Sequence, residues 1–120
     1  SDCSTSWGLV QVLGLRKAME LALLADVVDA AEALRLGLVN RVVPIDALHA
    51  EGERLTQRLA AGPTQALGQL KRLLRAAPQN DLATHLHAEA AAFLHCAQTS
   101  DFTEGVGAFL DKRKPLFKGL

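Results

Sequence analysis

Apolar residues recur at spacings of three and four along most of the chain, and this periodicity predicts helices. The first predicted helix covers residues 16–25, where alanines and leucines share one face. Asp29 follows in the place of an N-cap, because its carboxylate can accept a hydrogen bond from a backbone N–H of the next turn. We expect it to open a helix over residues 30–36 that stops at Gly37, which favours the left-handed conformation.

Residues 38–44 break this pattern, because they hold the chain's one cluster of β-branched side chains. Their alternation predicts one short strand that ends at Pro44. A single strand cannot satisfy its own backbone hydrogen-bonding groups. Either it pairs with something outside this chain, or it is an extended segment.

The helical period returns after this segment. Asp46 is predicted to cap a helix that ends at Gly62, and Pro63 suits the first turn of the helix that follows. After a turn at 78–80, either Asn80 or Asp81 is expected to cap a long helix.

The last predicted helix starts at Ser100-Asp101 and ends by Pro115. Glu104 lies three residues after Asp101, which is the spacing of a capping box. Gly105 and Gly107 lie within its apolar stripe, where small residues allow close helix packing.

Composition supports a mostly α fold with at most one short strand. Ala and Leu together account for 42 of the 120 residues, and both are strong helix formers. Because Val, Ile and aromatic residues are few, the composition argues against an all-β sandwich or barrel. The length fits one domain with its own core. Apolar residues begin already at Trp7, so we expect the chain to be the second part of something larger.

Charge and hydropathy exclude several function classes. The formal net charge is +0, whereas a general nucleic-acid binder needs a basic excess. No apolar run approaches the ~20 residues of a membrane span, and no signal peptide is apparent. Cys3 and Cys96 lie far apart and form no CxxC pair, so a reducing cytoplasm is the expected location.

The candidate chemistry is concentrated at the end of the chain. The four histidines have no metal-ligand spacing, so we expect surface histidines and no metal site. No glycine-rich phosphate loop is present. Residues 112–118 hold four of the 13 basic groups. Favourable interaction with the helix dipole accounts for one or two of them. The alternative is an anion site, with phosphate as the obvious ligand.

Two long motifs carry a family resemblance. Residues 29–44 read DAAEALRLGLVNRVVP, and residues 101–119 read DFTEGVGAFLDKRKPLFKG. Together with Gly62-Pro63 and Lys71, their order and spacing resemble the crotonase superfamily of enoyl-CoA hydratases and isomerases. The resemblance implies the C-terminal portion of a crotonase-like α/β (ββα spiral) fold. Residues 1–44 would end the spiral core, and residues 45–120 would form a helical oligomerisation region.

The resemblance also implies an activity. Family members, lyases or isomerases of fatty acid metabolism, bind acyl-CoA thioesters and stabilise an enolate in an oxyanion hole of two backbone N–H groups. Because that hole belongs to the N-terminal half of the fold, we expect this chain alone to be inactive. No cofactor beyond the acyl-CoA substrate is implied, and the intact protein would be a trimer or a dimer of trimers. The alternative is a helical oligomerisation or interaction module without chemistry.

Four positions match functional residues of the family. Asp2 matches a loop acid that shuttles a proton in some isomerases, although it could equally be an ordinary exposed terminal residue. The family's Leu-Pro-Arg nearby is replaced by Val10-Gln11-Val12. Phe109 and Lys112 match residues that contact coenzyme A bound to a neighbouring subunit, and Phe93 matches a position near the acyl pocket. Both phenylalanines lie on apolar stripes, where a role in the core is an equal alternative.

Overall fold

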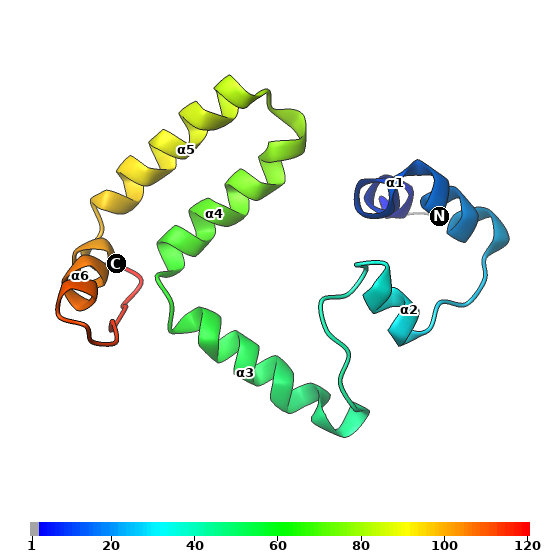
Figure 1. Cartoon of the computed structure of the whole chain (residues 1–120), viewed down its shortest axis with the longest axis horizontal. Helices are drawn as coiled ribbons and strands as arrows, with labels where there is room; N and C mark the ends of the chain where they lie inside the picture. The colour runs from blue at the N-terminus through cyan, green and yellow to red at the C-terminus, as the bar shows by residue number, and fades with distance from the viewer. Residues whose placement is uncertain (1–2) are drawn as a thin grey trace. The chain divides into compact units, whose positions relative to one another are not determined.

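The computed structural model describes residues 3–120, which form six α-helices and two short 3-10 turns (Figure 1). The described residues contain no strand, and the predicted mostly α fold is confirmed. The elements are α1 (Thr5–Leu24), α2 (Ala30–Arg35), η1 (Ile45–Ala47), α3 (Leu48–Ala60), α4 (Thr64–Ala76), η2 (Ala77–Gln79), α5 (Leu82–Ala97) and α6 (Ser100–Leu110).

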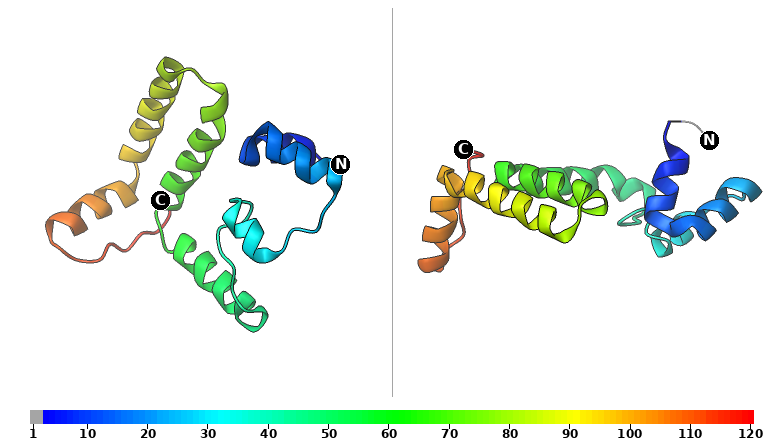
Figure 2. Two further views of the ribbon diagram at one scale, coloured as in Figure 1. Left: turned by 45° about the vertical axis from the view of Figure 1, so that its right-hand side comes forward. Right: turned by 90° about the horizontal axis from the view of Figure 1, so that it is seen from above.

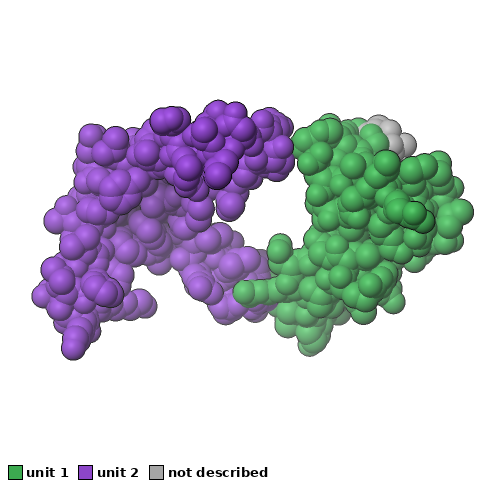
Figure 3. Space-filling view, turned by 45° about the horizontal axis from the view of Figure 1, so that its top comes forward, with its two compact units in different colours: residues 1–48 green, residues 49–120 purple. Residues whose placement is uncertain are grey.

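The chain divides into two compact units, residues 1–48 and residues 49–120 (Figure 3). The first unit contains α1, α2 and η1, and the second contains α4, η2, α5, α6 and nearly all of α3. The expected boundary at 44/45 lies close to this division. Assignment of the two parts to a spiral core and an oligomerisation region stays a prediction.

In the first unit, α1 is two helical stretches joined at Gly14, whose φ of 72° and ψ of 163° are not helical. The predicted helix at 16–25 corresponds to the second stretch. The first stretch was not predicted. Ser4, a residue type that often caps helices, precedes it, but has a φ of 66° and forms no side-chain cap. Ala18, in the second stretch, is the buried residue of this helix.

Two of the four predicted aspartate caps are confirmed. The Asp29 carboxylate accepts the Glu32 N–H at 2.8 Å, and Asp81, rather than the asparagine before it, accepts the Thr84 N–H at 2.7 Å. Asp46 is not a cap, because it lies inside η1. Helical structure begins with η1 at Ile45, two residues before the start at residue 47 that the periodic pattern predicts.

Helix α2 ends at Arg35, and Gly37 follows as the predicted left-handed stop with a φ of 75°. The Leu38 N–H donates to the Ala33 carbonyl at 2.9 Å, and the Gly37 N–H donates to that of Leu34 at 3.1 Å. These two bonds define a Schellman turn. The following residues, 38–44, form no strand in the described chain, so the predicted strand is not found. A strand needs a partner for its N–H and C=O groups, and the unit supplies none.

In the second unit, α4 and α5 lie side by side as an antiparallel hairpin closed by η2 (Figures 1 and 2). The preceding helix α3 ends before Gly62 as predicted, where a Cβ would lie 3.2 Å from the Leu59 carbonyl oxygen. Pro63 stands just before α4 as its N-cap residue, one position earlier than expected. Here the missing N–H of proline leaves no helical bond unmade.

Little of the apolar surface is covered within the described residues. The buried hydrophobic residues are Ala18 and Ala108, and no large side chain is fully buried. Leu70 and Leu74 on α4 and Leu86 on α5 are all more than half exposed. Burying one such side chain contributes roughly 1.5–3 kcal/mol, so these helices are stabilised far less by burial than a closed core would allow.

Candidate functional site

The C-terminal end of α6 is a second Schellman turn. The Arg113 N–H donates to the Ala108 carbonyl at 3.0 Å, and the Lys112 N–H donates to the Phe109 carbonyl at 3.2 Å. Lys112 occupies the left-handed position with a φ of 53°, where glycine is usual. Placing a residue with a Cβ there costs about 1 kcal/mol or more, so this turn holds a strained lysine.

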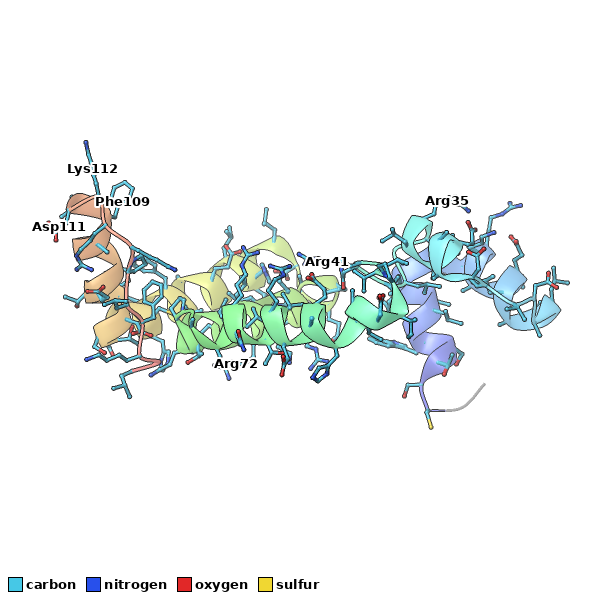
Figure 4. The ribbon with its side chains drawn as sticks, turned by 90° about the horizontal axis from the view of Figure 1, so that it is seen from below. Arg35, Arg41, Arg72, Phe109, Asp111 and Lys112 are labelled. Carbon is cyan, nitrogen blue, oxygen red and sulfur yellow. The ribbon has the colours of Figure 1, made fainter. Side chains whose placement is uncertain are left out.

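Two of the predicted site residues meet at this turn. Phe109 and Lys112 project in the same direction from the end of α6, and Asp111 points to another side (Figure 4). Phe109 is 82 % exposed, and Lys112 is exposed as well. The Phe109 ring is therefore not part of a core within this chain. The two side chains offer a flat apolar surface beside a cation.

The chain that follows the turn is tied back to the start of α6. Asp101, which is 4 % exposed, accepts the Lys118 N–H at 2.7 Å and the Gly119 N–H at 2.8 Å. In return, the Asp101 N–H and the Ser100 hydroxyl both donate to the Leu120 main-chain oxygen, at 3.1 and 2.8 Å. Asp101 and Ser100 together thus fix the last three residues against the helix N-terminus.

The predicted capping box between Asp101 and Glu104 is wrong. The cap is Thr99, whose hydroxyl accepts the Phe102 N–H at 3.1 Å. Both acids instead bind residues 113–119, which lie 9 to 18 positions further along the chain. The two acids are three residues apart, as in a capping box, but their carboxylates bind groups far along the chain and not the start of the helix.

Glu104 forms a clamp with Arg113. The two Nη atoms of Arg113 donate to the two carboxylate oxygens at 2.7 and 2.9 Å, and the Leu116 N–H donates to Oε1 at 2.8 Å. These donors, with the Arg113 guanidinium foremost, lower the pKa of Glu104 from 4.5 to about 2. The Arg113 Nε also faces Asp111 Oδ2 at 3.4 Å. One of the four predicted anion-binding bases is therefore neutralised within the chain.

An apolar groove of about 380 Å³ lies beside this turn, between α4, α5, α6 and the chain end. Phe102, Phe109 and Phe117 line it. The Phe117 ring comes within 3.4 Å of where a Cβ of Gly105 would lie. Gly105 was predicted to allow close helix packing, but it instead leaves room for the Phe117 ring of the C-terminal segment.

Phe93 is 61 % exposed on α5 and does not line this groove. Its ring meets that of Phe102 edge to face, with centroids 5.9 Å apart. Phe93 therefore lies against Phe102, which lines the groove together with Phe109. Asp2, the fourth predicted site residue, lies outside the described residues.

Among residues 3–120, the other His, Cys, Asp and Glu side chains form no group of three that could share a metal ion. His85 is half-buried, with Asn80 and Glu89 at 3.4 and 3.6 Å, and the other histidines are exposed. Cys3 and Cys96 are free thiols. No helix within residues 3–120 is long and apolar enough to cross a membrane.

The structure therefore adds Asp101, Glu104 and Arg113 to the predicted site residues. Sequence reasoning assigned the two acids to a helix cap and the arginine to an anion site. The only signal was that two acids and the basic cluster belong to one motif at residues 101–119. Nothing in the local spacing distinguishes a cap from a contact with residues nine or more positions away.

Known proteins match this chain over nearly its whole length. The family model Enoyl-CoA hydratase/isomerase matches residues 1–120. The 1,2-epoxyphenylacetyl-CoA isomerase of Escherichia coli K12 is 37 % identical over 98 % of this chain and 45 % of its own length. The crotonyl-CoA hydratase of Syntrophomonas wolfei is also 37 % identical, over 91 % of this chain and 42 % of its own.

Solved structures of enoyl-CoA hydratases also match this chain over nearly its whole length. The enoyl-CoA hydratase subunit I of Geobacillus kaustophilus superposes with a TM-score of 0.95 at 34 % identity, covering 99 % of this chain and 46 % of that one. The enoyl-CoA hydratase of Polaromonas sp. JS666 gives 0.90 at 32 % identity, over 98 % and 46 %. The chain thus spans somewhat less than half the length of these relatives. It belongs to the enoyl-CoA hydratase/isomerase family.

Proposed function

We propose that this chain is the C-terminal, helical part of an enoyl-CoA hydratase/isomerase that acts on acyl-CoA thioesters. The observation that carries the proposal is the pair at the end of α6, where Phe109 and Lys112 project together and stay exposed. In the family, the matching residues contact coenzyme A bound to a neighbouring subunit.

The chemistry of the two side chains suits that ligand. Lys112 carries three N–H donors and a compact positive charge, which can pair with a phosphate of coenzyme A. Phe109 offers a ring face on which the nucleobase can stack, an interaction worth about 1–3 kcal/mol per base in nucleic-acid complexes. The acyl chain would lie nearer Phe93, where the family has its acyl pocket.

The reaction itself needs groups outside the described residues. In the family, two backbone N–H groups of the N-terminal half stabilise the thioester enolate, because they point at the oxygen on which negative charge develops. We infer that this chain alone does not hydrate or isomerise a thioester, and that the intact protein needs no further cofactor. Asp2 would be the proton shuttle if the protein is an isomerase.

The ligand role is tested by the affinity of the intact protein for coenzyme A, measured by calorimetry. Lys112→Ala should weaken binding about tenfold, the usual scale for one charge-assisted hydrogen bond. Lys114→Ala removes the same charge two residues away and is the matched control. Equal losses in both variants would show a diffuse basic surface and contradict the proposal.

The absence of activity is tested with the 120-residue chain alone. Turnover of crotonyl-CoA, followed by loss of the thioester's ultraviolet absorbance, should stay at the rate of the uncatalysed reaction. A rate near that of the intact protein would overturn this part of the proposal.

A helical oligomerisation module without chemistry is the second candidate. It is favoured by the exposed leucines of α4 and α5, since contiguous exposed apolar surface marks an interaction site. Sedimentation of the intact protein should give a trimer or a dimer of trimers. Self-association without any coenzyme A affinity would favour this candidate over the first.

A further inference from the structure

We propose that Glu104 is a positioning residue for the ligand-binding lysine, acting through its clamp on Arg113. The inference rests on the proposed function, in which Lys112 meets a phosphate of coenzyme A. It adds a residue that touches no ligand and fixes where the cation stands.

The argument begins with the strain at Lys112. Its left-handed conformation is unfavourable for any residue with a Cβ, and the turn persists only if its surroundings enforce it. The backbone bonds of the Schellman turn tie the Lys112 and Arg113 N–H groups to the last turn of α6. The clamp adds a second restraint just beyond Lys112, because Glu104 holds the side chain of the very next residue, Arg113.

The clamp also fixes the chain beyond the turn. The same carboxylate oxygen that binds Arg113 Nη1 accepts the Leu116 N–H, at 2.8 Å. Residues 113 and 116 are thus both tied to one side chain on the body of α6. Lys112 is left as the exposed cation between two restrained segments.

Arg113 is a poor candidate for the phosphate ligand itself. Both of its Nη atoms bind Glu104, and its Nε faces Asp111. A carboxylate pair leaves the guanidinium with little net attraction for a second anion. Arg113 therefore acts through its ion pair with Glu104, and Lys112 supplies the positive charge for the phosphate.

Glu104→Gln separates positioning from charge. The amide keeps the size of the side chain but has one acceptor oxygen, so it cannot receive both Nη donors and the Leu116 N–H. Glu32→Gln is the matched control, because Glu32 makes a similar two-bond contact with Arg35 on α2. Coenzyme A is the probe, and the intact protein is used throughout.

A double-mutant cycle with Lys112→Ala gives the decisive readout. We expect Glu104→Gln to weaken coenzyme A about five- to tenfold, Lys112→Ala about tenfold, and the double variant no more than Lys112→Ala alone. Glu32→Gln should leave affinity unchanged. A merely structural role for Glu104 would instead give losses that multiply.

The failures are distinguishable. No loss with Lys112→Ala overturns the proposed role of Lys112 and this inference with it. A loss with Lys112→Ala but none with Glu104→Gln, or losses that multiply, overturns this inference alone. If Glu104→Gln does not fold, Arg113→Lys replaces it. That variant keeps the charge and loses the two-pronged fork, and it should show the same dependence on Lys112.

Discussion

Helices α2 and α6 both end in a Schellman turn, but the left-handed position holds a glycine in one and a lysine in the other. Both turns have the two Schellman hydrogen bonds, from the residues after the helix back to its last turn. Gly37 takes the left-handed position in the first and Lys112 in the second, with φ values of 75° and 53°. The first turn is relaxed, while the second keeps a conformation that its residue disfavours.

The two ends also differ in what their ion pairs hold. Glu32 and Arg35 are three residues apart on α2, so their pair restrains only that helix. Glu104 and Arg113 are nine apart and span the turn, so their pair restrains the chain that leaves it. At the end of α6, side-chain contacts nine or more residues apart therefore restrain a turn whose conformation is unfavourable for its lysine.

Untying the chain end should have the largest effect. The buried Asp101 carboxylate accepts two hydrogen bonds, from the Lys118 and Gly119 N–H groups. In Asp101→Asn, the amide NH2 would face one of these N–H groups, so that two donors oppose each other. We expect the free energy of unfolding to fall by about 2–3 kcal/mol. Denaturant titration measures it, and hydrogen exchange should rise in residues 113–120. Asp29→Asn is the control, because asparagine caps a helix as well as aspartate does, and its effect should be near zero.

Making the relaxed turn resemble the strained one should have the next largest effect. Gly37→Lys forces a side chain with a Cβ into the left-handed position. The expected loss is about 1–2 kcal/mol, read from the same titration. The space around Gly37 is open, so crowding does not contribute. No loss of stability would mean that the strain assigned to Lys112 is absent.

The reverse change should have a smaller effect of opposite sign. Lys112→Gly relieves the strain at the end of α6 and should raise the free energy of unfolding by about 0.5–1 kcal/mol. Lys112→Ala removes the same charge but keeps a Cβ, so it should bring no such gain. A gain shared by both variants would assign the effect to charge rather than to conformation.

The smallest predicted change concerns pH. Because the pKa of Glu104 falls from 4.5 to about 2 on folding, the clamp stabilises the folded chain above pH 4.5. This contribution is lost as the pH falls from 4.5 through about 2 and the carboxylate is protonated. An NMR titration of the Glu104 carboxyl carbon should give a midpoint near 2, moving toward 4.5 in Arg113→Gln. A midpoint near 4.5 in the unaltered protein would show that the clamp does not persist in solution.

Local signals predicted the helices well. The caps at Asp29 and Asp81 and the stop at Gly37 depend on partners within five residues, so their spacing in the sequence is sufficient. Residues 38–44 are an extended segment and not a strand in the described chain. Their β-branched side chains would form a strand only where a neighbouring strand could pair with them, and local spacing does not show whether one is present.

The candidate site was predicted in part. Phe109 and Lys112 came from the family resemblance, and the structure adds that they project together. The roles of Asp101 and Glu104 could not be read from spacing, because their partners lie 9 to 18 residues away and depend on how the chain end folds back. An acid near a helix start fits a cap and a tether equally well.

The break in α1 illustrates a constraint of another kind. Gly14 has open space where a Cβ would be, yet its φ of 72° and ψ of 163° lie in the mirror image of the extended region. Every L-amino acid, whether small or large, meets the same torsional barrier there. D-alanine, introduced by chemical synthesis, should be accepted without rearrangement. At this position the chain selects its residue by handedness rather than by volume.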